Sequence, residues 1–385
     1  MKTIYFDNAA TTKVDERVLK AMFPYFSEKF GNASSQHSKG REAKEAVEKA
    51  RKIIAKSINA KSREIFFTSG GTESNNWALK GLYFWNKENN TGKNHLVTTS
   101  IEHDCILKTC KWLEKQGAKI TYLDADSEGF VSLNQLENSI TDKTIVVSVI
   151  HGNNEIGTIQ DLKEIGKICK EKNVLFHTDA CQSFTKTKID VEKMNLDLVT
   201  LNAHKIHGPK GVGALYIKEG IKIIPLLHGG GHEKGLRSGT ENTPGIVGFG
   251  KSIKIANKKD VENMKRLRDK LIEGILKIEN VKLNGPIGEK RLCNNINISF
   301  NDIEGEAVGG YLEQKGILTS TGSACSSHTL ETSHVLKATG LSPLQANSSI
   351  RISLSKFTNE KEVDYFLKVL PKIVKKLRRF SPFIS

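Results

Sequence analysis

The chain of 385 residues is 38% hydrophobic, which is enough to bury the cores of one large domain and a smaller one. Its 58 Lys and Arg exceed its 43 Asp and Glu, for a net charge of +15, but no nucleic-acid-binding motif accompanies these basic residues, so we expect no nucleic-acid partner. No stretch of about 18 apolar residues is present, and we therefore expect no membrane-spanning segment.

The cysteines and the N-terminal residues predict a compartment. The six cysteines lie too far apart in the sequence for a paired zinc motif, and nothing in their spacing favours a disulfide framework. The opening MKTIYFDNAATT lacks the apolar run of a signal peptide. Both observations predict a cytoplasmic protein with reduced thiols.

The first predicted element is an amphipathic helix over residues 40–58. Apolar residues recur there every three or four positions: Ala43, Ala46, Val47, Ala50, Ile53, Ile54 and Ile58. Short apolar runs then follow at 64–69, 95–100, 144–150, 174–179 and 196–202, with room for a helix between them. This alternation predicts an α/β fold with a mostly parallel sheet covered by helices.

After about residue 258 the pattern changes. A long charged helix (KDVENMKRLRDKLIEGILKI), a strand-like NNINISF and a final helix (EKEVDYFLKVLPKIVKKLRRF) predict a second, smaller α/β unit. We therefore predict a large domain over residues 15–258 and a small domain formed by residues 1–14 and 259–385.

Polar residues follow several predicted strands, at the edge where open α/β sheets collect their ligands. Ser69-Gly70-Gly71-Thr72 comes after the first strand and opens a helix. Two glycines let the backbone approach a ligand, and the free amides of a helix N-terminus with a Thr hydroxyl suit a phosphate. For this motif alone, an ordinary strand-to-helix turn is an equally good interpretation.

Two further strand ends carry a carboxylate and an amine. Asp179 ends the strand VLFHTD, where a helix-capping role is the commoner explanation, and Lys205 follows the strand before the turn GPKG. A phosphate cradle, a carboxylate and a desolvated lysine at successive strand ends are the set that pyridoxal phosphate needs: the lysine holds its aldehyde, the carboxylate keeps its ring nitrogen protonated and the helix N-terminus holds its phosphate.

Two more residues could serve the same site. His103, in SIEHDC, follows a strand, where an imidazole could stack on the cofactor ring or move protons, although a core histidine is an equal alternative. Arg351 lies in the apolar alternation SSIRISLS, where a guanidinium needs a partner. A substrate carboxylate would provide one, and a buried Asp or Glu would serve equally.

Cys325 lies in TSTGSACSSHT, among small polar residues. Structural cysteines are usually buried among hydrophobic residues, whereas a reactive thiol needs access to substrate. The stretch favours a reactive cysteine. In contrast, HGGGH (228–232) has the histidine spacing of a zinc helix, but its glycines would break that helix, so we expect no metal there.

As a set, these residues resemble the cysteine desulfurases of the NifS/IscS type, in the class V branch of the fold-type I pyridoxal-phosphate enzymes. The resemblance covers nearly the whole chain and rests on the segments YFDNAATT, FGNASSQHSKGREA, FTSGGTESNN, EHDC, GNNEIGTIQ, HTDACQ, AHKIHGPKGVGALY, HGGGHEKGLRSGTEN, STGSACSS and SSIRISL. It implies the fold of a fold-type I transferase, with the catalytic cysteine loop and the substrate-binding arginine in the small domain.

The resemblance also implies a role for each matching residue. Lys205 would bind the cofactor and move the α-proton, Asp179 would pair with the ring nitrogen and His103 would stack on the ring. The other cofactor contacts would come from Gly71, Thr72, Asn154, Gln182, Asn202 and His204, with Thr240 supplied by the neighbouring subunit of a homodimer. Arg351, assisted by Asn154, would hold the carboxylate of L-cysteine.

In this family the loop cysteine, here Cys325, takes the sulfur as a persulfide and leaves L-alanine. The persulfide then passes to a sulfur acceptor or an iron–sulfur scaffold protein. We expect no resident metal, although Cys325 could contact a cluster transiently during this transfer. The product sulfur would serve iron–sulfur cluster assembly or thiolation.

Three departures and two alternatives accompany the resemblance. Asn202 stands where many relatives have a serine against the phosphate, SLSKF replaces the common SLGRF, and the chain stops soon after the segment where scaffold-binding relatives continue. Another class V enzyme, an aminotransferase or selenocysteine lyase, would share the cofactor residues without needing Cys325. A non-catalytic binding dimer would not need to keep Lys205, Asp179, His103 and Cys325 together.

Overall fold

The structure is a computed structural model that describes residues 3–321 and 332–381. In this part of the chain, seven strands form the central sheet in the order β2-β8-β7-β6-β5-β3-β4. Their bounds are β2 Ile65–Thr68, β3 His95–Thr99, β4 Lys119–Leu123, β5 Thr144–Ser148, β6 Leu175–Asp179, β7 Leu198–Asn202 and β8 Gly213–Ile217. Strand β8 is antiparallel to both neighbours and the remaining pairs are parallel, which confirms the predicted mostly parallel sheet.

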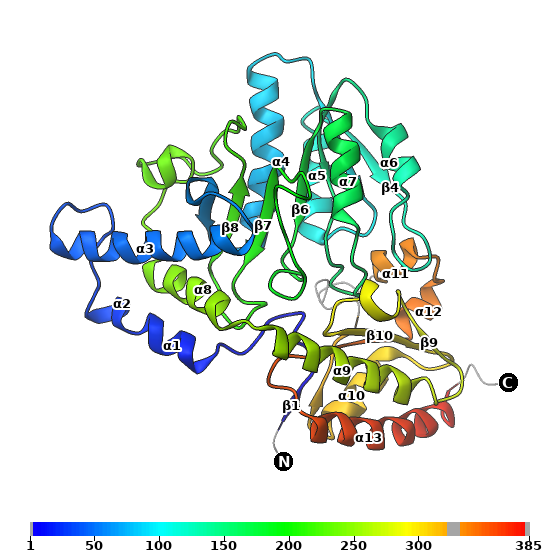
Figure 1. The fold of residues 1–385 in the computed structure, drawn as a ribbon. Coiled ribbons are helices and arrows are strands. Elements are labelled where there is room, and N and C mark those ends of the chain that lie inside the picture. The colour runs from blue at the N-terminus through cyan, green and yellow to red at the C-terminus, as the bar shows by residue number, and fades with distance from the viewer. Residues whose placement is uncertain (1–2, 322–331, 382–385) are drawn as a thin grey trace.

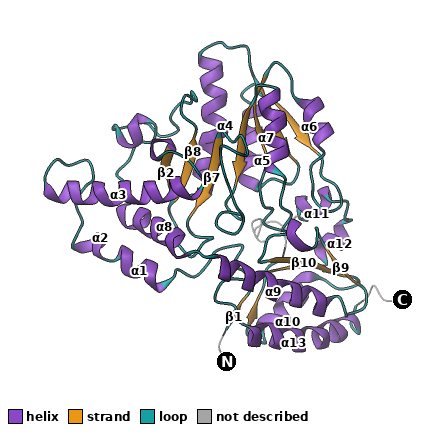
Figure 2. Ribbon diagram, in the orientation of Figure 1, coloured by secondary structure: helices purple, strands orange, loops and turns teal. Residues whose placement is uncertain are grey.

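Helices cover both faces of this sheet (Figures 1 and 2). One face packs against α3 (Ser38–Ser57), α6 (Leu133–Ser139), α7 (Leu162–Glu171) and α8 (Thr243–Ile255), and the other against α4 (Gly71–Glu88) and α5 (Asp104–Glu114). Two shorter helices, α1 (Glu16–Met22) and α2 (Pro24–Ser27), lie against α8. Apart from the outermost strand β4, the strands are therefore buried on both sides, which explains their largely apolar sequences.

The predicted helix over 40–58 is α3, which begins two residues earlier. Its buried positions include Ala43, Val47, Ala50 and Ile54, which repeat every three or four residues as expected, and Ile58 directly after the helix is also buried. The five predicted strands are confirmed as β2, β3, β5, β6 and β7, whereas β4 and β8 were not predicted.

A second group of elements forms its own core below the large sheet in Figure 1. A three-stranded antiparallel sheet, β9 (Val281–Leu283), β10 (Asn295–Phe300) and β12 (Ser349–Ser353), packs with α9 (Lys258–Ile275), α10 (Gly305–Glu313) and α13 (Glu360–Arg378). The N-terminal β1 (Ile4–Tyr5) pairs in parallel with β11 (Ile317–Leu318). Ile4 and Phe6 are buried in this second core, so the first residues of the chain pack with its last third.

Five short elements complete the described structure. They are α11 (His334–Ala338), α12 (Pro343–Asn347) and the 3₁₀ turns η1 (Ser62–Glu64), η2 (His232–Gly235) and η3 (Gly288–Lys290). Within the described residues, no helix is both long enough and apolar enough to cross a membrane.

Candidate active site

The predicted site residues gather at the carboxyl edge of the large sheet, because the parallel strands all end there. Asp179 is the last residue of β6 and Asn202 the last residue of β7. Gly71 begins α4 after β2, and His103 caps α5 after β3. Lys205 lies three residues beyond the end of β7, so its backbone also starts from this edge.

The Asp179 carboxylate is buried, with only 5% of the residue exposed. Its Oδ2 accepts a hydrogen bond of 2.7 Å from Asn75 Nδ2, and its Oδ1 accepts one of 2.8 Å from the Cys181 amide. Asn75 lies one turn into α4 and was not singled out in the sequence, where only the i, i+4 spacing from Gly71 could have indicated it. The two donors hold the carboxylate in one orientation.

His103 is held by its role as N-cap of α5, where Nδ1 accepts a hydrogen bond from the Cys105 amide at 3.2 Å. A neutral ring that accepts at Nδ1 carries its proton on Nε2. Burial lowers the pKa of His103, while the charge of Asp179 acts in the opposite direction. His103 is therefore a neutral imidazole at pH 7 with one N–H to offer.

The turn that carries Lys205 packs against the N-terminal segment. Lys205 Nζ donates a hydrogen bond to the Ala9 carbonyl, which also accepts from Gln182 Nε2 at 2.8 Å. Thr12 donates both its amide and its hydroxyl to the carbonyl of His204, at 2.9 and 2.8 Å. Burial is the main cause that lowers the pKa of His204 to about 4. Residues 9–12 thus form one wall beside the lysine.

The start of α4 packs closely against the sheet at Gly71. A Cβ on Gly71 would lie 2.6 Å from Cys181 Sγ and 3.7 Å from Asn202 Nδ2, so both side chains face the first turn of α4. Thr72 is exposed at this helix start. Glu73 accepts from the Ser69 amide at 2.7 Å and forms an ion pair with Arg237 at 2.8 Å.

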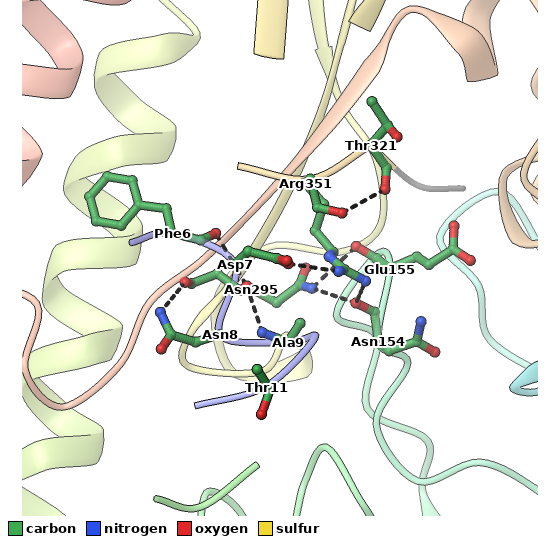
Figure 3. A network of polar contacts seen from close by, with 12 residues as sticks. Phe6, Asp7, Asn8, Ala9, Thr11, Asn154, Glu155, Asn295, Thr321 and Arg351 are labelled. Carbon is green, nitrogen blue, oxygen red and sulfur yellow. Dashed lines mark hydrogen bonds and ion pairs between the residues drawn. The ribbon is translucent and has the colours of Figure 1, made fainter. Parts of the chain in front are cut away.

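Arg351, in β12, enters the site from the second sheet (Figure 3). Its side chain is 3% exposed, and its guanidinium pairs with Asp7 Oδ1 at 3.0 Å and donates to the Asn154 carbonyl at 3.2 Å. Its Nε is buried and has no hydrogen-bond partner in the described structure. An acidic partner, the alternative considered from the sequence, is therefore present as the partly buried Asp7, yet one donor of the guanidinium stays available.

Cys325 lies outside the described residues, but both ends of its segment are placed. On one side Ser320 exchanges backbone hydrogen bonds with Arg351, at 3.1 and 2.6 Å. On the other side Ser333 donates to Glu155 at 2.5 Å, and a His334 ring nitrogen lies 2.8 Å from the carbonyl of Glu102, the residue before His103. The described residues that flank Cys325 in the sequence therefore contact Arg351 on one side and Glu102, next to His103, on the other.

Thr240 is the predicted site residue that the resemblance assigns to the neighbouring subunit. It is exposed, between η2 and α8, on the same segment as Arg237. This segment is anchored by a buried ion pair, in which Glu233 accepts two hydrogen bonds of 2.7 Å from Arg51 and a third of 2.9 Å from the Phe67 amide.

The residues present at the sheet edge fit pyridoxal phosphate. Asn75 Oδ1 and Asn202 Oδ1 are buried and accept no hydrogen bond within the described structure. Gly71 lets the start of α4 approach the sheet more closely than any other residue could, because a Cβ there would lie 2.6 Å from Cys181 Sγ. An 18-residue helix offers its N-terminal amides and the Thr72 hydroxyl, beside a buried carboxylate, a neutral imidazole and a lysine.

Comparison with known proteins agrees with this geometry. The sequence model of the family Aminotransferase class-V matches residues 4–366. The chain is 52% identical to the cysteine desulfurase IscS of Clostridium botulinum, over 99% of this chain and 96% of that protein. It is 51% identical to the cysteine desulfurase IscS of Methanosarcina thermophila, over 99% of this chain and 94% of that protein.

Solved structures are similar over the same length. A NifS-like protein superposes with a TM-score of 0.90 at 42% identity, over 97% of this chain and 100% of the other. SspA in complex with cysteine superposes with a TM-score of 0.83 at 40% identity, over 93% and 100% of the two chains. On its sequence and its fold alike, the chain belongs to the class V aminotransferase family of pyridoxal-phosphate-dependent enzymes.

Proposed function

We propose that this protein is a cysteine desulfurase that converts L-cysteine to L-alanine and takes the sulfur on Cys325. The relatives named above carry this activity in their names, and one similar structure is described as a complex with cysteine. The observation that carries the proposal is the placement of the described residues on either side of Cys325: Ser320 pairs with Arg351, and His334 contacts the carbonyl of Glu102, the residue before His103.

The cofactor would be held by the residues at the sheet edge. Lys205 would bind its aldehyde, Asp179 its ring nitrogen, and His103 would stack on the ring. The phosphate would be held by Gly71, Thr72, Asn202 and His204, and the ring oxygen by Asn154 and Gln182. Once bound, pyridoxal phosphate supplies an electron sink that stabilises negative charge at the substrate α-carbon.

Arg351 would bind the substrate carboxylate. Its buried Nε has no partner in the described structure, and a carboxylate can accept from Nε and a terminal nitrogen at once. Asp7 and the Asn154 carbonyl hold the guanidinium in place before substrate arrives. This pairing avoids a buried uncompensated charge in the free enzyme.

Protons are moved by Lys205 and His103. The Lys205 amine would take the α-proton of the substrate, and the His103 Nε2–H is placed to donate a hydrogen bond, because Nδ1 is committed to the Cys105 amide. The Cys325 thiolate would then attack the substrate sulfur. The new S–S bond forms as the Cβ–S bond breaks, and the carbon skeleton takes up a proton, so that L-cysteine and a thiol become L-alanine and a persulfide.

A homodimer forms part of the proposal, since Thr240 would complete the phosphate site of the neighbouring subunit. Thr240 is exposed and its segment is anchored by the buried Arg51–Glu233 pair, which supports a role outside its own subunit. Large exposed apolar side chains on and beside α1 and α2 are consistent with a covered surface: Leu19, Phe23, Phe26 and Phe30.

The remaining parts of the proposal concern organisation and partners. We propose the domain division at residues 15–258 against 1–14 and 259–385, which the packing of Ile4 and Phe6 in the second core supports. The persulfide would pass to a sulfur acceptor or an iron–sulfur scaffold protein in the cytoplasm. The five cysteines among the described residues are free thiols, in keeping with such a compartment.

The test is the formation of alanine and sulfide from L-cysteine, with a reductant and pyridoxal phosphate, by the native protein and by Cys325→Ala. The variant should keep the yellow cofactor and lose both products. Cys169→Ala is the matched control, because Cys169 lies on the buried face of α7, in the core of the large sheet, and should tolerate the change. An equally active Cys325→Ala, or a keto acid in place of alanine, would support a lyase or an aminotransferase instead.

A further inference from the structure

Lys186 contacts the backbone of Lys205, the proposed cofactor lysine, and the sequence analysis did not single it out. It is one turn beyond Gln182, in the segment that follows β6, and is partly buried. Its Nζ donates to the Gln182 carbonyl at 2.7 Å and to the Lys205 carbonyl at 3.3 Å. Lys186 and Lys205 also line one cavity of about 40 Å³, between their turns and the start of α9.

The surroundings of Lys186 contain little to balance its charge. Among the described residues it forms no ion pair with a carboxylate. Burial lowers its pKa to about 8, with Cys293 acting in the opposite direction and Lys205 in the same one. The other titratable groups that face it or share its cavity are Cys181, His204, His207, Asp260 and Lys356. A lysine buried there without a carboxylate partner destabilises the folded protein, so its presence points to a role in the site.

We propose that Lys186 is a positioning residue for Lys205, which ties the backbone of Lys205 to that of Gln182 and places a positive charge at the Lys205 carbonyl. The inference rests on the proposed function, in which Lys205 binds the cofactor and moves a proton.

Two consequences follow from this placement. One ammonium group bonded to both carbonyls keeps the lysine and the glutamine of the site in a constant relative position. A neighbouring cation also disfavours the protonated form of the Lys205 nitrogen, so that nitrogen releases its proton more readily. Near pH 7 both effects operate, because Lys186 is then mostly protonated.

The experiment compares the native protein with Lys186→Gln, which can still donate to the two carbonyls but carries no charge. The absorbance of the protein loaded with pyridoxal phosphate is titrated against pH, and the rate of cofactor capture by the apoprotein is measured at pH 7. We expect the midpoint of the absorbance change to rise by about one pH unit and capture to slow about tenfold. Lys186→Arg, which keeps the charge, should restore the native midpoint.

The exposed Lys188, two residues away, provides the matched control, and Lys188→Gln should leave the titration unchanged. An unchanged midpoint in Lys186→Gln would overturn the proposal, as would a fall in alanine formation that is uniform with pH and has no shift in midpoint. If neither Lys186→Gln nor Lys186→Met folds, Lys186 is a structural residue and the proposal is wrong. If the native protein neither binds the cofactor nor forms alanine, the proposed function itself has failed.

Discussion

Gly71→Ala gives the sharpest test of the cofactor site, because a single atom opposes the new methyl group. The added Cβ would lie 2.6 Å from Cys181 Sγ, about 0.8 Å inside the 3.4 Å at which ordinary contacts begin, while the next atoms are at 3.7 and 3.8 Å. Cys181 is 9% exposed and its amide is bonded to Asp179, so the thiol has little freedom to withdraw. Overpacking of this kind costs about 1–3 kcal/mol.

If this strain moves the start of α4, pyridoxal phosphate should bind about 5- to 150-fold more weakly, as measured by fluorescence titration of the apoprotein. Cys181→Ala removes the obstructing sulfur, so the double variant should recover most of the affinity. Gly310→Ala is the control, because no atom lies within 4 Å of its Cβ position and it is far along the chain in α10. Native affinity in Gly71→Ala, or no recovery in the double variant, would refute the reasoning.

Three further predictions concern the substrate site, pH and the anchored segment. Arg351→Lys should raise KM for L-cysteine at least tenfold with a smaller change in kcat, because an ammonium cannot bind a carboxylate through two parallel donors; unchanged steady-state kinetics would contradict this. Burial is the main cause that lowers the pKa of His177 to about 4 in the folded protein, whereas an unfolded histidine has a pKa of about 6.5. Below about pH 6.5 the unfolded chain therefore binds more protons at this residue than the folded protein does. The free energy of unfolding should therefore drop from pH 6.5 toward pH 4, by up to about 1.4 kcal/mol per pH unit from this residue, and urea unfolding of His177→Gln should show a shallower drop; an identical pH dependence would count against it. Glu233→Ala removes the buried carboxylate that pairs with Arg51 and leaves this guanidinium with only the half-exposed Glu48 as an acidic partner. The change should cost up to about 3–5 kcal/mol in chemical denaturation, and a loss below about 1 kcal/mol would show that the Arg51–Glu233 pair does not stabilise the segment.

Local pattern was sufficient for much of the fold. The spacing of Ala43, Val47 and Ile54 predicted α3 because one helical face is buried, and the apolar runs predicted five strands because both sheet faces are covered. Strand β4 was not predicted, because its residues do not form an apolar run. It is the outermost strand of the sheet, and most of its residues are only partly buried. Strand β8 (GALYI) was not predicted either, because no helix separates it from β7. It follows β7 after a glycine-containing turn and runs antiparallel to it, so it does not fit the alternation of strands and helices.

By itself, the sequence determined which chemical groups stand at strand ends: Asp179, Lys205, His103 and the glycines before α4. It could do so because the carboxyl ends of parallel strands meet at one edge, whatever the helices between them do. The tertiary structure alone decided which groups touch across the chain. Asp7 pairs with Arg351 from 344 residues away, and Cys181 Sγ sets the space at Gly71. Lys186 reaches the carbonyl of Lys205 because two separate turns pack together. Such contacts depend on packing between segments that are distant in the sequence, and the local spacing of apolar residues does not predict them.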